Sequence, residues 1–265
     1  MHTTAAIAAL GPPDEPETTC GLGVLIDDRH VLSCAHVVNL ALGRDEACAD
    51  QPAGWVGIRF ASAQPKHACR GRVVRWAPVG AADHVEDLAV LELDRPVPVA
   101  ISRAQWFQPT WDQRLRAFGC PRGTLPGNWH DGAVKGFLPN GWVQIDDEAS
   151  PGVFLQPGFS GSPLWDASLV YATGIVVAAE RVDARQAGVG YGIPAAVLRE
   201  FWPDLKWASP ADAVLTRYGA QHVRAWEAAR ADPQDLDRLS HYVEPHYALL
   251  REGFQPADAS SRLVH

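Results

Sequence analysis

The chain has 265 residues, of which 47% are hydrophobic and 20% are charged, and its formal net charge is -8. This composition is typical of a globular protein with a sizeable core, and the acidic balance argues against binding to nucleic acid or anionic membranes. The longest early apolar run, residues 5–10, is too short for a signal peptide core or a membrane span. We therefore expect a cytoplasmic protein with neither nucleic acid nor membrane as a partner.

Short β-rich segments separated by turn residues occupy the chain from about residue 20 to residue 180. Such a series is typical of a sandwich or a barrel. Residues 102–114 lack a clear periodicity of apolar residues and divide the series into two similar halves. We therefore expect two β lobes. The segments are residues 21–26, 30–38, 55–61, 70–77, 87–94, 113–119, 141–146 and 170–180.

The character of the chain changes after about residue 209. Residues 210–231 carry Ala, Leu and Val at helical spacing. A second predicted helix, residues 232–253, opens with Asp232 as a plausible N-cap and Pro233 at the first helical position. We expect both helices to lie outside the β lobes.

The cysteines are odd in number and form neither a CxxC pair nor a set with paired histidines. We therefore expect free thiols rather than disulfides, and neither a metal nor a cofactor. The five cysteines are Cys20, Cys34, Cys48, Cys69 and Cys120.

A turn rich in glycine and proline, LQPGFSGSPLWD (residues 155–166), has Ser160 at its centre. Clusters of this kind are ordinary turns more often than active sites. His36 follows the apolar segment HVLSCA, where we expect a short helical loop, and Asp87 directly precedes the strand LAVLEL. Taken alone, His36 is best interpreted as structural and Asp87 as a turn cap. Together with Ser160 they would supply the base, the acid and the nucleophile that a serine enzyme needs.

Three motifs follow one another in the order His, Asp, Ser: VLSCAHVV (residues 31–38), DLAVLEL (87–93) and PGFSGSPL (157–164). In this order they resemble the motifs of the trypsin-like, chymotrypsin-fold serine proteases, and the resemblance covers roughly residues 18–205. Phe159 stands where secreted, zymogen-activated members have an aspartate, so we expect no activation by N-terminal trimming. The chain looks closest to intracellular bacterial and HtrA-type members.

The resemblance implies a mainly β fold of two six-stranded antiparallel β-barrels with a C-terminal helical extension. Four parts are then expected. They are an N-terminal arm (1–17), a first barrel lobe with the histidine and aspartate (18–105), a second barrel lobe with the serine (106–208), and a helical extension or linker (209–265).

The resemblance also implies a serine endopeptidase that works through an acyl-enzyme intermediate. His36 would be the base, Asp87 would orient it, and Ser160 would attack the peptide carbonyl. The backbone N–H groups of Gly158 and Ser160 would form the oxyanion hole. The specificity pocket would be lined by Phe154, Leu155, Gln156, Pro157, Val177, Ala178, Ala179 and Gly190.

The expected partner is a protein or peptide substrate, and a specific protein substrate under conformational control is favoured. Phe154 falls where a preference for Arg or Lys would require an aspartate, so we expect an apolar or small residue before the scissile bond. Trypsin-like domains similar to this one often begin large bacterial signalling or defence proteins, followed by a nucleotide-hydrolysing domain. The predicted C-terminal helices look like the approach to such a domain, although the chain has no phosphate-binding loop motif. A small helical tail packed on the barrels is the alternative.

Two other functions compete with the peptidase. An α/β-hydrolase esterase needs the order Ser, acid, His and the motif G-x-S-x-G, whereas GFSGS ends in Ser162 and follows a β-rich body. The second competitor is a trypsin-like fold that has lost activity and serves as a scaffold or binding module. The retention of His36, Asp87 and Ser160 argues against it.

Overall fold

The computed structural model of the chain describes residues 6–15, 17–60, 67–81, 84–98, 104–109, 111–121, 127–147, 155–166, 171–180 and 189–208. Residues Met1–Lys206 form one compact unit and Trp207–His265 a second. The predicted helical extension, residues 209–265, lies outside the described residues. No helix in the described part of the chain is long and apolar enough to cross a membrane.

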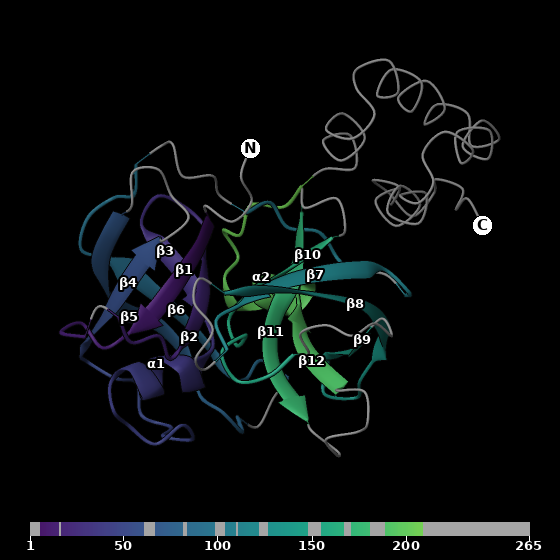
Figure 1. Cartoon of the computed structure of the whole chain (residues 1–265), viewed down its shortest axis with the longest axis horizontal. Helices are drawn as coiled ribbons and strands as arrows, with labels where there is room; N and C mark the ends of the chain where they lie inside the picture. The colour runs from purple at the N-terminus through teal and green to yellow at the C-terminus, as the bar shows by residue number, and fades with distance from the viewer. Residues whose placement is uncertain are drawn as a thin grey trace. The chain divides into compact units, whose positions relative to one another are not determined.

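The first six strands form one closed antiparallel barrel, drawn in purple and blue in Figure 1. Their order around the barrel is β1-β2-β3-β6-β5-β4, and β1 closes it by pairing with β4. The strands are β1 (Ile7–Gly11), β2 (Gly21–Leu25), β3 (His30–Ser33), β4 (Trp55–Phe60), β5 (His67–Ala77) and β6 (Leu88–Leu93).

The next six strands form a second closed antiparallel barrel, beside the first in Figure 1. Read from β7, their order is β7-β8-β9-β12-β11-β10, which repeats the order of the first barrel. The strands are β7 (Arg114–Gly119), β8 (Asn128–Phe137), β9 (Val143–Asp147), β10 (Pro163–Asp166), β11 (Ala172–Glu180) and β12 (Val189–Pro194). The predicted fold of two six-stranded antiparallel barrels is confirmed.

The predicted N-terminal arm is corrected by the structure. Strand β1 lies within residues 1–17, and its backbone pairs with both β2 and β4 as a wall of the first barrel. Its residues IAALG are buried on both faces except for a partly exposed Ala9. A short apolar run without alternation does not distinguish a fully buried strand from other apolar segments, and this is why the strand was missed.

Strand β8 was also absent from the predicted segments. Its sequence, NWHDGAVKGF, contains two glycines and an aspartate, which lower the β-propensity of a segment. Pairing with β7 and β9 on its two sides nevertheless holds it in the second barrel. Tertiary pairing therefore overrides a weak local preference here.

The burial pattern of β2 shows that this strand faces the second barrel. On β5, buried and exposed residues largely alternate, as expected for a strand with one face in water. Strand β2, in contrast, is buried at all of its positions. The backbone N–H of Leu22 on β2 donates to the carbonyl of Ser160 in the second barrel at 2.8 Å. Strand β2 therefore packs against the segment that contains Ser160.

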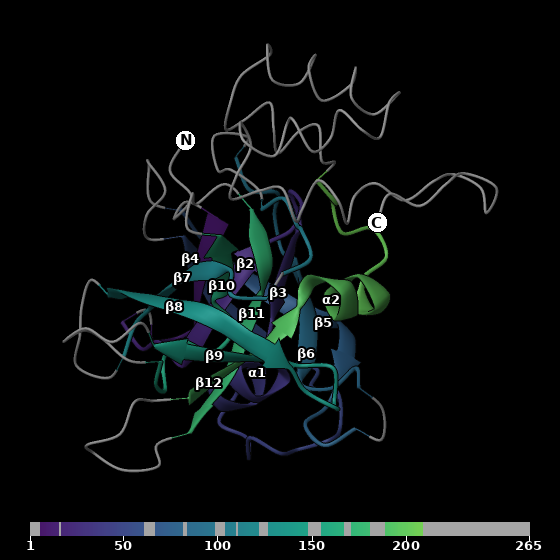
Figure 2. The same ribbon diagram turned by 90° about the vertical axis from the view of Figure 1, so that its right-hand side faces the viewer.

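Two short helices complete the described structure, and Figure 2 shows them from the side. Helix α1 (Ala35–Ala41) follows β3, where the sequence predicted a short helical loop. Helix α2 (Ala195–Phe201) follows β12. The guanidinium of Arg75 on β5 lies over the ring of Phe201 at 5.3 Å, so α2 joins the second barrel to the first.

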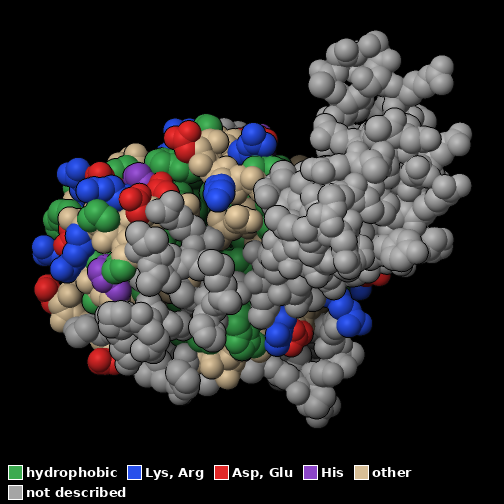
Figure 3. Space-filling view, turned by 90° about the horizontal axis from the view of Figure 1, so that it is seen from above, with side chains coloured by type: hydrophobic (Ala, Val, Ile, Leu, Met, Phe, Trp, Pro, Cys, Tyr) green, Lys and Arg blue, Asp and Glu red, His purple; other side chains and the backbone are tan. Residues whose placement is uncertain are grey.

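Charged side chains of both signs are interspersed on the face drawn in Figure 3. Exposed ion pairs such as Arg72–Glu92 and Arg116–Asp131 join neighbouring strands. Exposed pairs of this kind contribute about 0–1 kcal/mol each, so the barrels depend mainly on their apolar cores. All five cysteines are free thiols, as predicted, with Cys34 and Cys69 buried.

Candidate active site

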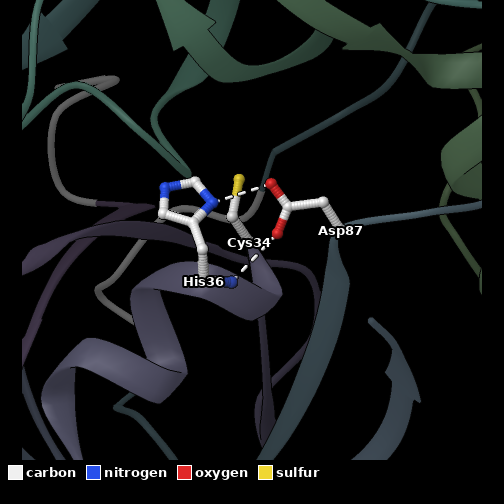
Figure 4. Close-up of side chains that lie close together, drawn as sticks. All are labelled: Cys34, His36 and Asp87. Atoms are coloured by element: carbon white, nitrogen blue, oxygen red, sulfur yellow. Dashed lines mark hydrogen bonds and ion pairs between the residues drawn. The ribbon is translucent and has the colours of Figure 1, made fainter. Parts of the chain in front are cut away.

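His36 and Asp87 come together because of the pairing of two strands. Strands β3 and β6 are antiparallel neighbours, with Ser33 opposite Ala89. The end of β3 and the start of β6 therefore meet at the same edge of the barrel. His36 lies in the first turn of α1, just after β3, and Asp87 directly precedes β6. Figure 4 shows the two side chains facing each other.

The carboxylate of Asp87 holds His36 at two points. Oδ2 lies 2.7 Å from the ring Nδ1 of His36, and Oδ1 accepts the backbone N–H of His36 at 2.9 Å. Only 4% of Asp87 is exposed, so its carboxylate requires these hydrogen bonds in place of water. Asp87 also has a φ of 52°, a strained value for a non-glycine residue of the kind found at functional sites.

Ser160 lies in a tight turn that glycine makes possible. The N–H of Phe159 donates to the carbonyl of Gln156 at 3.1 Å, and the N–H of Ser162 donates to the carbonyl of Phe159 at 2.9 Å. Gly158 has a φ of 105°, and a Cβ there would lie 2.4 Å from the carbonyl oxygen of Cys120. A side chain at Gly158 is therefore excluded both by backbone strain and by the lack of space.

The ring of Phe159 anchors this turn in the core of the second barrel. Phe159 is fully buried, among a cluster that includes Leu115, Val134 and Leu164. Its ring lies against Gly119, where an added Cβ would come within 2.4 Å of it. Phe159 stands where secreted members of the family have an aspartate, and here the turn is held by apolar packing.

The hydroxyl of Ser160 points to a β-bulge on β11. Its Oγ donates to the carbonyl of Val177 at 3.5 Å, which is a long hydrogen bond. The register between β11 and β12 shifts between Val176 and Ala178, so Val177 is the extra residue of the bulge. Bulges often redirect groups next to active sites. Here the bulge turns a carbonyl toward Ser160.

Two backbone donors of the turn remain available. Among the hydrogen bonds of the described residues, none uses the N–H of Gly158 or of Ser160. These are the two N–H groups that the family resemblance assigns to an oxyanion hole.

The predicted specificity pocket is only partly described. Leu155 is 3% exposed and belongs to the core cluster, and its Cδ1 would lie 2.2 Å from a Cβ added to Gly190. The side chain of Leu155 therefore fills the space beside Gly190. Val177 is buried as well, while Gln156 and Pro157 are part of the turn. The remaining predicted residues are Phe154, which lies outside the described residues, and Ala178 and Ala179, which are placed on β11 without a description of their side chains.

Cys34 is the neighbour that the sequence did not single out. One ligand atom each from Cys34, His36 and Asp87 lies within 4.8 Å of the others. Burial raises the pKa of the Cys34 thiol well above its usual range, and the negative charge of Asp87 raises it further. Metals bind the thiolate, and His36 Nδ1 already faces Asp87, so this cluster favours hydrogen bonding over metal ligation. The sequence held one sign that Cys34 is unusual. It occupies the N-cap position of α1, where Ser, Thr, Asp or Asn is usual.

Comparison with known proteins places this geometry in a family. The family model described as a trypsin-like peptidase domain matches residues 21–179. A comparison with curated proteins gave no match. Among solved structures, many chains share the fold.

Three of these structures illustrate the likeness. The serine endoprotease from Yersinia pestis is 20% identical with a TM-score of 0.53, and the match covers 76% of this chain and 63% of that one. The MamO protease domain from Magnetospirillum magneticum is 17% identical with a TM-score of 0.52, covering 75% of this chain and 97% of that one. Neuropsin, a serine protease of mouse brain, is 20% identical with a TM-score of 0.53, covering 72% and 91%.

These likenesses show the shared fold, and the chain spans 63% of the length of the Yersinia pestis structure. The family itself is shown by the model that matches residues 21–179. The chain belongs to the family of trypsin-like peptidase domains.

Proposed function

We propose that the chain is a serine endopeptidase whose catalytic residues are His36, Asp87 and Ser160. The observation that carries the proposal is the two-point hold of Asp87 on His36, at 2.7 Å and 2.9 Å. A carboxylate on Nδ1 leaves Nε2 as the ring nitrogen that can accept a proton. The hydrogen bond from Leu22 to the carbonyl of Ser160 supports the proximity of the serine turn to the same edge.

In the proposed reaction, His36 takes the proton of the Ser160 hydroxyl as Oγ attacks the substrate carbonyl. The N–H groups of Gly158 and Ser160 stabilise the oxyanion that forms. His36 then gives its proton to the leaving amine, and an acyl-enzyme remains on Ser160. Water, activated by His36 in the same way, releases the acyl group.

The long hydrogen bond from Ser160 to Val177 suggests that the serine must turn toward His36 before it reacts. We infer that a specific protein substrate is cleaved under conformational control by a partner or an attached domain. The resemblance to domains of bacterial signalling and defence proteins favours a cytoplasmic setting and a C-terminal nucleotide-hydrolysing regulator. The apolar side chain of Leu155 against Gly190 favours an apolar or small residue before the scissile bond.

Covalent labelling by a fluorophosphonate tests the proposal on the intact chain. We expect one label per chain, lost in Ser160→Ala and kept in Ser162→Ala. Ser162 is the matched control because it lies two residues away in the same turn and its hydroxyl bonds the carbonyl of Pro163. An intact chain that stays unlabelled alone and with added substrate or nucleotide would instead support an inactive scaffold.

A peptide-library digest then defines the substrate class. The proposal predicts cleavage after apolar or small residues, abolished in Ser160→Ala. Cleavage mainly after Arg or Lys would contradict the predicted preference while leaving the peptidase activity established.

A further inference from the structure

The Cys34 thiol has an unusual direction for a residue at the start of a helix. Cys34 is the N-cap of α1, yet its side chain makes no capping hydrogen bond. Its Sγ donates instead to the carbonyl of Val176 on β11 at 3.4 Å, across 142 residues of sequence. Cys34 is fully buried, so water does not compete for this contact. The thiol therefore connects the first barrel to the second.

The segment of β11 that accepts the hydrogen bond of the thiol also accepts hydrogen bonds from the serine turn. The carbonyl of Val176 accepts the N–H of Gly161 at 2.8 Å, and the next carbonyl, that of Val177, accepts the Ser160 hydroxyl at 3.5 Å. The Cys34 thiol thus shares its acceptor with the N–H of Gly161, the residue that follows Ser160.

On its other side, Cys34 is next to the His36–Asp87 pair. Figure 4 shows the sulfur beside the line that joins the His36 ring to the Asp87 carboxylate. Cys34 is also joined through the backbone to Ala35 and so to His36. Burial raises the pKa of the thiol, which keeps it in the protonated form that can donate to Val176.

We propose that Cys34 is a positioning residue, whose thiol fixes the distance between the His36–Asp87 pair of the first barrel and the Ser160 turn of the second. This inference rests on the proposed peptidase function. It requires no change in the chemistry of Cys34 during the reaction. Since small misplacements of reacting groups have large effects on rate, a weak thiol hydrogen bond at this point can still be important for turnover.

The test compares Cys34→Ala, Cys34→Ser and the matched control Cys69→Ala by kcat per labelled active site, KM and Tm. Cys69 is a second buried cysteine, on β5, where it pairs with Ile58 of β4. We expect Cys34→Ala to lower kcat about 10-fold with KM within twofold, because it removes the donor. Cys34→Ser, which keeps a donor, should recover kcat to within about threefold of the parent. Cys69→Ala should leave kcat per labelled site within about twofold.

Several results would overturn the inference. One is an unchanged kcat per labelled site in Cys34→Ala with only a lower Tm, which is the result of a packing role alone. Another is a kcat for Cys34→Ser as low as that of Cys34→Ala. If Cys34→Ala does not fold, Cys34→Val fills the space without a donor and takes its place in the comparison. A parent chain that is neither labelled nor active removes the proposed function, and this inference with it.

Discussion

In the first barrel, His36 is held by hydrogen bonds to the buried carboxylate of Asp87, whereas in the second barrel Ser160 is held through the apolar packing of Phe159. The two barrels share one strand order, so this difference does not come from topology. It comes from the residues in the loops that follow or precede equivalent barrel walls. One barrel supplies a charged pair whose orientation is fixed, and the other supplies a backbone turn whose shape is fixed.

This comparison predicts a separation of effects. Changes to the polar support in the first barrel should lower activity at little cost in stability. Changes to the apolar support in the second barrel should lower stability first. Asp87→Asn and Phe159→Ala test this separation directly, and variants of Gly158 and Cys69, with smaller expected effects, test each barrel further.

Asp87→Asn should lower kcat about 10⁴-fold with a near-native circular dichroism spectrum, because the amide no longer holds the His36 ring in the reactive tautomer. The first barrel offers a matched control in Asp27. Its carboxylate makes the same two contacts with His30, at 2.9 Å to the backbone N–H and 2.7 Å to Nδ1, but in a half-buried turn outside the candidate site. Asp27→Asn should therefore leave kcat unchanged. An equal loss in both variants would show that the Asp87 contact has no special role.

Phe159→Ala should lower the free energy of unfolding by about 3–5 kcal/mol, because it leaves a cavity in the core of the second barrel. Urea denaturation followed by tryptophan fluorescence measures this change. Phe137, which is 51% exposed on β8, supplies the control: Phe137→Ala should change stability by less than about 0.5 kcal/mol. A Phe159→Ala chain as stable as the parent would mean that something other than the core holds the serine turn.

Gly158→Ala should lower kcat/KM about 10²- to 10³-fold, because the Cβ collides with the carbonyl of Cys120 and displaces an oxyanion donor. Gly43 also has a positive φ, of 66°, but no atom lies within 4 Å of its added Cβ. Gly43→Ala should therefore keep full activity at a small cost in stability. Similar activity losses in the two variants would show that the strain of a positive φ lowers activity, and not the collision with Cys120.

The smallest effect concerns the pH dependence of stability in the first barrel. Burial raises the pKa of Cys69 to about 12, with a further contribution from the charge of Asp94. The unfolded chain loses this proton near pH 9 while the folded chain keeps it, so the free energy of unfolding falls as pH rises from about 9 toward 12. The slope from this thiol is at most about 1.4 kcal/mol per pH unit. Thermal melts of the parent and Cys69→Ala between pH 8 and 10.5 should differ in slope by up to this amount, and parallel curves would contradict the burial of a neutral thiol.

The repeated β-rich segments were sufficient to predict two β lobes, because alternating apolar patterns and turn residues are local signals. Strand β1 was missed since IAALG has no alternation, and β8 was missed since its glycines weaken the local pattern. Both strands are specified by their neighbours in the barrel. A single sequence does not show which strands pair with each other.

The candidate site likewise combines contacts that could be predicted from the sequence with contacts that could not. The encounter of His36 with Asp87 was expected from the motif order, and the carboxylate of Asp87 lies within hydrogen-bonding distance of both the backbone N–H and the ring Nδ1 of His36. The contact between Cys34 and Val176 could not, because it joins segments 142 residues apart and depends on how the barrels meet. The bulge at Val177 was also hidden, because its sequence GIVVAA has no glycine or proline at the irregular position.

The most direct measurement of whether the two barrels form one catalytic site is the rate at which a fluorophosphonate labels Ser160 in the parent and in His36→Ala, followed by mass spectrometry of the labelled peptide. Residue 36 belongs to the first barrel and the labelled serine to the second. If His36 takes the proton of Ser160, labelling in the folded variant should be at least about 10³-fold slower than in the parent. Labelling of Ser160 at the parent rate in His36→Ala would show that the two residues do not act together.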